Sequence, residues 1–150
     1  MKVSLNRASA KSPRWMDAAW RRRVARAASG LGKRGATVNL VIVDDREIRR
    51  LNRRYRGQNK STDVLSFGYE AGLERDAVVG DVYVSHETLA RDARRLGLDE
   101  RHLSMRIVVH GFLHVVGYDH ESDADAARME RRERTVLKRV LPARVVRELF

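Results

Sequence analysis

Cysteine is absent from this 150-residue chain, and only two prolines occur in it. The lack of thiols excludes disulfides, iron–sulfur clusters, thiolate zinc sites and cysteine nucleophiles. No stretch approaches the roughly 18 apolar residues of a membrane span, and the N-terminal "MKVSLNRASAKSPRW" lacks the apolar core of a secretory signal. These absences predict a soluble cytoplasmic protein with no membrane association and no disulfide partner.

Linkers, internal repeats and low-complexity segments are also missing, so nothing in the sequence divides the chain. Its length fits one domain with a core of its own, and 43% of its residues are hydrophobic. We therefore expect a single globular domain over residues 1–150.

Acidic residues are scarce relative to basic ones, which leaves a formal net charge of +11. The excess is uneven: residues 1–34 hold ten lysines and arginines against one acid, Asp17, whereas residues 71–100 carry a net charge of −3. Arginine outnumbers lysine by 26 to 5, and guanidinium groups suit bidentate contacts with phosphate. This balance favours a polyanionic partner, nucleic acid before an anionic membrane, although a solubilising charged surface is the plainer alternative.

Apolar periodicity predicts an α+β fold, with a small mixed sheet of about four strands and about five helices packed around it. Short runs rich in β-branched residues indicate the strands, at residues 1–6, 36–43, 63–69 and 81–85. A glycine-containing acidic loop near residues 70–79 would join the last two strands. Helical spacing and capping residues indicate helices at 12–29, 85–96 and 123–141. Another helix would begin at Asp44 or Asp45 and carry Ile48, Leu51 and Tyr55 as apolar positions. A further helix would run from Asp99 into the histidines, and a short one would follow Pro142.

Three of the five histidines fall in "HGFLHVVGYDH", residues 110–120. His110 and His114 are four residues apart on an apolar helix, so they share one face of a buried segment. Gly117 allows the left-handed conformation that ends a helix, and His120 follows where the returning chain can face the other two. The pattern predicts a metal site at the end of this helix.

Three neutral imidazoles suit zinc and leave a fourth position open for chemistry. We expect one zinc ion per chain, although nickel, cobalt or copper would also accept these ligands. The alternative is a pair of core histidines satisfied by hydrogen bonds. The spacing resembles the long zinc motif of metzincin proteases, but Gly111 stands where those enzymes have the glutamate that activates water.

Basic residues gather in a second stretch, "LNRRYRGQNKSTDVLSFGYE" at residues 51–70. Arg53, Arg54, Arg56 and Lys60 place four cations near the turn from a helix into a strand, which makes a plausible phosphate-binding edge. Arg21 and Arg22 on the first helix are further candidates for RNA contact on charge alone. A solvated charged face is the alternative for both groups.

Taken together, three segments resemble the YbeY family of bacterial rRNA-maturation factors, which are metal-dependent single-strand endoribonucleases. "HGFLHVVGYDH" is similar to the family signature H-G-x-L-H-x-x-G-y-D-H, "NRRYRGQNKSTDVLSF" to N-x-x-Y-R-x-x-D-x-P-T-D-V-L-S-F, and "GDVYVS" to G-D-I-x-I-S. The chain departs from the family at Asn59, Ser61 and Gly68, where aspartate and two prolines are usual. These departures touch the loop around 58–68 and leave the histidines unchanged.

This resemblance implies that His110, His114 and His120 hold zinc and that Arg56 is the catalytic cation. It also implies a role in maturing the 3′ end of small-subunit (16S) rRNA and in ribosome quality control, with rRNA and the small ribosomal subunit or its proteins as partners. Asp119 is expected to orient an imidazole or to serve as a turn residue. Two alternatives stay open: a zinc peptidase or other metallohydrolase, and a non-enzymatic ribosome-assembly factor with structural zinc.

Overall fold

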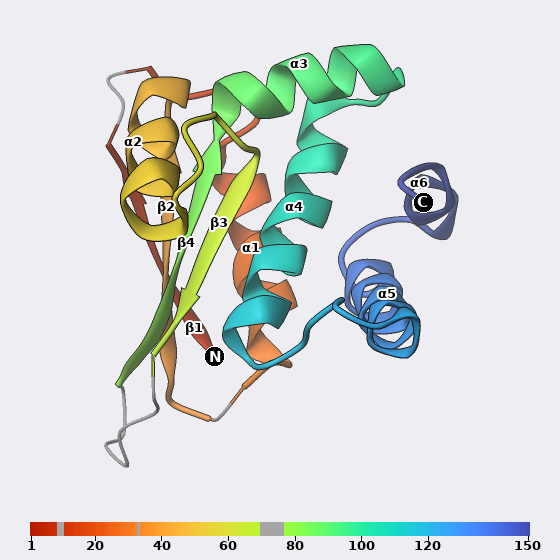
Figure 1. Ribbon diagram of the computed structural model, residues 1–150. Helices are drawn as coiled ribbons and strands as arrows, with labels where there is room; N and C mark the ends of the chain where they lie inside the picture. The colour runs from red at the N-terminus through yellow and green to blue at the C-terminus, as the bar shows by residue number, and fades with distance from the viewer. Residues whose placement is uncertain (9–10, 33, 70–76) are drawn as a thin grey trace.

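The computed structural model describes residues 1–8, 11–32, 34–69 and 77–150 (Figure 1). Within these residues the chain forms an α+β fold with a four-stranded mixed sheet and six helices, one in each segment that the sequence indicated as helical. Most of the expected acidic loop, residues 70–76, lies outside the described residues. No helix in the described part of the chain is long and apolar enough to cross a membrane.

The sheet has the strand order β1-β2-β4-β3. Its first three strands are parallel: β1 (Lys2–Arg7), β2 (Thr37–Val43) and β4 (Val78–Ser85). The edge strand β3 (Val64–Gly68) runs antiparallel to β4. β4 begins three residues before the predicted strand, because its backbone pairs with β2 on one side and with β3 on the other.

Helices cover both faces of this sheet, as Figure 1 shows. α1 and α4 lie on one face and α2 lies on the other, while α5 and α6 pack outside α4 and α3 crosses one end of the sheet. The bounds of the helices are α1 Ala18–Ser29, α2 Asp45–Arg56, α3 His86–Leu96, α4 Glu100–Val115, α5 Asp123–Lys138 and α6 Ala143–Glu148.

Alternation along β2 separates two apolar cores. Val38, Leu40 and Ile42 are at most 1% exposed and join the large core under α1 and α4. Val43 lies in a smaller core with Ile48 of α2. A buried polar contact lies within the large core, where the Trp20 indole N–H donates to the Ser104 hydroxyl at 2.8 Å.

Other details of the sequence prediction are also wrong. α1 begins at Ala18 rather than residue 12, because Met16 N–H donates to the Pro13 carbonyl in a preceding turn and the Asp17 carboxylate then caps the helix by accepting from Trp20 N–H. Tyr55 is not a core residue, since 56% of it is exposed at the end of α2. α5 ends at Lys138, three residues early.

α4 lies unusually close to the sheet at Gly111. A Cβ atom at this position would come within 2.6 Å of Val82 Cγ1 and 3.1 Å of the Ser66 hydroxyl oxygen. The Ser66 hydroxyl donates instead to the Gly111 carbonyl at 3.2 Å. The absence of a side chain therefore lets the histidine-bearing helix rest directly on the two strands at one edge of the sheet.

Candidate metal centre and cleft

α4 holds two of the histidines on a rigid, buried support. The helix starts with Asp99, whose carboxylate accepts from His102 N–H at 3.1 Å, and it buries eight of its 16 residues. It ends before Gly117, which has a φ of 103°. Tyr118 N–H donates back to the Leu113 carbonyl at 2.9 Å, so the chain turns and returns along the end of its own helix.

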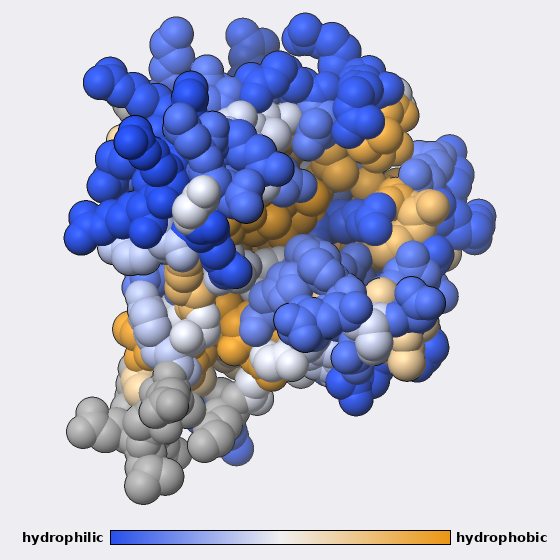
Figure 2. Space-filling view, viewed as in Figure 1, coloured by the Kyte–Doolittle hydropathy of each residue, from blue (hydrophilic) through white to orange (hydrophobic). Residues whose placement is uncertain are grey.

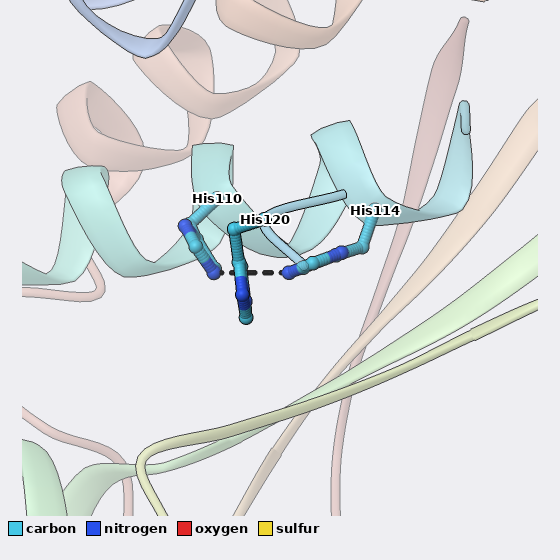
Figure 3. Close-up of side chains that lie close together, drawn as sticks. All are labelled: His110, His114 and His120. Atoms are coloured by element: carbon cyan, nitrogen blue, oxygen red, sulfur yellow. Dashed lines mark hydrogen bonds between the residues drawn. The ribbon is translucent and has the colours of Figure 1, made fainter. Parts of the chain in front are cut away.

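This turn brings His120 to the other two histidines. One ring nitrogen from each of His110, His114 and His120 lies within 4.8 Å of the others, a grouping that can hold a metal ion. Figure 3 shows the three imidazoles converging, two from α4 and one from the loop after it. His110 Nε2 and His114 Nε2 are 3.1 Å apart.

Hydrogen bonds at the far side of two rings fix their tautomers. His110 Nδ1 lies 2.5 Å from Glu133 Oε1, and His114 Nδ1 lies 3.0 Å from the Tyr118 carbonyl oxygen. A carboxylate and a carbonyl only accept hydrogen bonds, so each Nδ1 carries the proton and donates it. In the neutral rings both Nε2 atoms then present lone pairs to each other across 3.1 Å. Such a contact is unfavourable unless a metal ion or a shared proton lies between the two nitrogens.

The geometry fits a tetrahedral metal ion. Two nitrogens that are each about 2.0–2.1 Å from a tetrahedral zinc ion lie roughly 3.3–3.4 Å apart, close to the observed separation. Burial, followed by the charges of His110 and His120, lowers the pKa of His114. A lowered pKa keeps that ring in the neutral form that binds metals.

Glu133 is a site residue that the sequence analysis missed. It lies on α5 and is 3% exposed, and its carboxylate binds the far nitrogen of His110. A signal was present: Met129, Glu133, Val136 and Leu137 follow helical spacing and form the buried side of α5. One acid on an otherwise apolar stripe indicates a buried partner, but 23 residues separate it from that partner.

Asp119, expected to orient an imidazole or to serve in a turn, accepts a hydrogen bond from His120 N–H at 2.7 Å. This contact positions the backbone that carries the third imidazole. Among the described residues, the carboxylate hydrogen-bonded to one of the three rings is Glu133. Asp63 also lies near the site, and burial, followed by the charge of Asp92, raises the pKa of its carboxyl group.

The imidazoles form one wall of a cleft of about 820 Å³. Arg56, at the end of α2, belongs to the same cleft. Its Nη2 donates to the Ser66 carbonyl at 2.8 Å and its guanidinium carbon lies 5.3 Å from the centre of the Phe67 ring. In the view of Figure 2, hydrophilic side chains cover the α2 side of the molecule and apolar atoms are visible in the hollow beside it. The full lining comprises Asn52, Arg56, Gln58, Asp63, Val64, Leu65, Ser66, His110, His114, Gly117, Tyr118, Asp119, His120 and Glu121.

The loop between α2 and β3 is tied to the helix before it. Asn52 is 4% exposed and its amide donates to the Lys60 carbonyl at 2.9 Å. Arg49 Nε donates to the side-chain oxygen of Asn59 at 3.0 Å. Asn59, one of the departures from the family signature, therefore offers its side-chain oxygen to Arg49 as a hydrogen-bond acceptor.

The other predicted RNA-contacting residues divide into two places. Arg53, Arg54 and Lys60 are exposed around the end of α2 and the loop after it, beside the cleft but outside its lining. Arg21 and Arg22 are exposed on α1, and Arg22 lines a separate hollow of about 570 Å³. The structure therefore brings Arg56 to the histidines and leaves the α1 arginines elsewhere.

Gly111 also bears on the peptidase alternative. Residue 111 faces the sheet so closely that its Cβ would overlap Val82. A metzincin-like glutamate has no room at this position, because its Cβ would already collide with β4 and crowd β3. The spacing of the three histidines is shared with those proteases, but the position of their general base is filled by strand packing.

Comparison with known proteins identifies the relatives of this chain. Residues 6–141 match the model of the family described as Endoribonuclease YbeY. A protein of that name from Anaeromyxobacter sp. (strain Fw109-5) is 42% identical over 132 residues, which are 85% of this chain and 67% of the relative. Another, from Halorhodospira halophila, is 45% identical over 108 residues, 69% of this chain and 70% of the relative. A third, from Methylocella silvestris, is 42% identical over 105 residues, 70% of this chain and 60% of the relative.

A solved structure shares the fold of this chain. The solution structure of a Thermotoga maritima protein matches with a TM-score of 0.65 at 25% identity, over 92% of this chain and 88% of that one. The family match spans most of the chain and includes all three histidines and Arg56. The resemblance noted in the sequence is confirmed: this chain belongs to the YbeY endoribonuclease family.

Proposed function

We propose that this protein is a zinc-dependent, single-strand-specific endoribonuclease that acts in 3′-end maturation of small-subunit rRNA and in ribosome quality control. The observation that carries the proposal is the convergence of three imidazole nitrogens within 4.8 Å of one another, in a cleft that also contains Arg56. Membership of an endoribonuclease family supports RNA as the substrate. The whole chain, residues 1–150, would act as one domain in the cytoplasm.

His110, His114 and His120 would hold the metal ion through one ring nitrogen each. When bound, the ion supplies Lewis-acid chemistry that polarises a phosphoryl oxygen and acidifies water. The protein contributes the arrangement around it: α4 fixes two imidazoles, and the turn at Gly117 sets the third. Three imidazoles favour zinc over magnesium or calcium, whose preferred ligands are oxygens.

Arg56 would stabilise the charge that develops on the scissile phosphate. Its guanidinium is anchored at one nitrogen by the Ser66 carbonyl and is placed near the Phe67 ring. The remaining N–H donors of the planar fork are available to a phosphate in the cleft. A lysine in this place would keep the charge but lose the fork.

The RNA backbone would continue from the cleft over the basic surface around the end of α2. Arg53, Arg54 and Lys60 are exposed there and can contact phosphates without reading bases. Binding should therefore weaken steeply with added salt, as counterion release requires. A partner on the small ribosomal subunit would place the correct rRNA strand in the cleft.

Cleavage of a single-stranded fragment of rRNA by the purified zinc-loaded protein tests the proposal. His114→Ala is expected to abolish cleavage, whereas His102→Ala, which changes a histidine at the start of the same helix, should cut at the wild-type rate. Equal cleavage by wild type and His114→Ala would reveal a contaminating nuclease or a wrongly assigned site. Zinc binding without cleavage would favour the assembly-factor alternative, and cleavage of casein would favour a peptidase.

A further inference from the structure

Glu133 has the one charged side chain that is buried in the described part of the chain. It is 3% exposed, whereas every other buried polar residue there is an asparagine or a serine. Burial of a carboxylate is costly unless partners compensate it. Glu133 Oε1 lies 2.5 Å from His110 Nδ1, and Oε2 lies 3.5 Å from Arg106 Nε without a hydrogen-bond partner. A buried carboxylate with one oxygen left without a hydrogen bond lowers stability, so we expect Glu133 to have a function that offsets this cost.

We propose that Glu133 is a positioning residue of the metal centre, which holds His110 in the tautomer and orientation that direct Nε2 at the ion. The proposal rests on the metal site of the proposed function. Its basis is the direction of the contact: the carboxylate only accepts, so it keeps the proton on Nδ1 and leaves the Nε2 lone pair free. A negative charge behind the ring also raises the basicity of the coordinating nitrogen.

The surroundings of Glu133 hold it in that role. Arg106 lies one turn before His110 on α4 and offers a positive charge beside the second carboxylate oxygen. Arg106 is itself fixed by a hydrogen bond to the Leu149 carbonyl and by the Phe150 ring, whose centre lies 3.8 Å from the guanidinium carbon. Leu149 and Phe150 therefore fix the position of Arg106, which in turn lies beside the Glu133 carboxylate.

The rings of His110 and His114 are held by different kinds of hydrogen-bond acceptor. His114 Nδ1 meets a neutral backbone carbonyl at 3.0 Å, which no side-chain substitution removes. His110 depends on a single side chain from another helix. Substitution of Glu133 is therefore a selective way to change one imidazole without touching a ligand.

The competing explanation is that Glu133 is merely the structural ion-pair partner of Arg106. Zinc affinity separates the two, because an ion-pair role predicts lower stability without weaker zinc binding by the folded protein. The variants are Glu133→Gln, which keeps an acceptor but loses the charge, and Glu133→Leu, which loses both. Glu130→Gln is the matched control, since Glu130 lies on the same helix, is about half exposed, and pairs with Arg134 instead.

Competition with a chromophoric chelator measures zinc affinity, with circular dichroism as the check on folding. Glu133→Gln should weaken zinc binding about 10-fold and Glu133→Leu about 100-fold, while Glu130→Gln stays at the wild-type value. Arg106→Gln leaves the contact between Glu133 and His110 in place and removes only the charge beside Oε2, so it should weaken zinc binding less than Glu133→Gln does. Wild-type affinity in both Glu133 variants, or an equal loss in Arg106→Gln, would overturn the proposal.

Nitrogen-detected NMR of the imidazoles in the metal-free protein supplies a second readout. The neutral His110 ring should carry its proton on Nδ1 in wild type and should shift toward the Nε2 tautomer in Glu133→Leu. If Glu133→Leu fails to fold, Glu133→Gln still decides the question through zinc affinity. Absence of zinc binding by wild type would contradict the proposed function, whereas normal zinc binding by wild type and by both Glu133 variants would contradict only the role of Glu133.

Discussion

The cleft contains two chemical groups that the protein holds in opposite ways. The histidines stand on α4, a helix that is buried on most sides, and two of their rings are fixed from behind by hydrogen bonds. Arg56 stands at the exposed end of α2, where one hydrogen bond and one aromatic ring position it. Two of the three histidines are thus carried by a buried helix, whereas Arg56 stands at the surface. Changes at the histidines should affect stability and chemistry together, and changes at Arg56 should affect chemistry alone.

Zinc binding should produce the largest effect, a gain in the free energy of unfolding that depends on the three histidines and not on Arg56. At a free zinc concentration 1,000 times the dissociation constant, a ligand that binds only the folded state adds about 4.1 kcal/mol of stability. For a chain of this size that corresponds to a rise in Tm of roughly 8–16 °C. Differential scanning calorimetry with and without zinc measures it. His114→Ala should show no such rise, and a full rise in that variant would place the zinc elsewhere.

Substitution of Arg56 should produce the next largest effect, a slower cleavage of RNA with no change in the zinc-dependent stability. Arg56→Ala is expected to lower kcat/KM about 100-fold, or about 2.7 kcal/mol, because a donor to the transition-state phosphate is lost. Arg56→Lys should recover only part of the rate, since lysine lacks the planar fork. Arg147→Ala, which removes an exposed arginine from α6, is the charge-matched control and should retain full activity. A smaller zinc-induced rise in Tm in Arg56→Ala would show that the two groups are not independent.

The close contact between α4 and the sheet should be the source of the rigidity on the histidine side. Gly111→Ala would force a Cβ against Val82 and should destabilise the protein by about 2 kcal/mol. Val82→Ala removes the atom in the way, and alone it should cost about 2 kcal/mol through the cavity it leaves. The double variant should be more stable than the sum of the single effects by about 1 kcal/mol or more. Urea unfolding of all four proteins measures this coupling, and simple additivity would contradict the contact.

The start of α2 should show a smaller, pH-dependent effect. Burial alone would raise the pKa of Asp45, but hydrogen bonds from Arg91, Thr88 and Ser85 outweigh it and hold the pKa below its ordinary value of 3.8. A carboxyl whose folded pKa is lowered stabilises the protein above its unfolded pKa, and that contribution disappears as the pH falls through the folded pKa. Asp45→Asn should therefore be less stable than wild type by about 1 kcal/mol at pH 7, with the difference vanishing in strong acid. Urea unfolding of both metal-free proteins from pH 7 down to pH 2 measures it, and a pH-independent difference would contradict the argument.

The elements of this fold follow from local sequence to a large extent. Capping residues such as Asp44, Asp99 and Gly97 mark helix ends in the sequence and occupy those positions in the structure. Alternation in residues 36–43 indicates a strand, and β2 is there. The predicted start of the first helix fails, because Pro13 and Asp17 each allow a helix to begin and only the Asp17 cap is used.

The grouping of the three histidines and the family of the chain follow from the amino-acid sequence alone. Helical periodicity places His110 over His114, and Gly117 turns His120 back within six residues, so short-range geometry suffices. The residues that surround these histidines depend instead on how distant segments fold together. The Glu133 carboxylate reaches His110 from another helix. The Ser66 carbonyl on β3 accepts a hydrogen bond from Arg56 on α2. Gly111 on α4 packs against Val82 on β4. Such contacts depend on which faces of distant segments pack together, and packing is set by the summed burial of the whole core rather than by any local pattern.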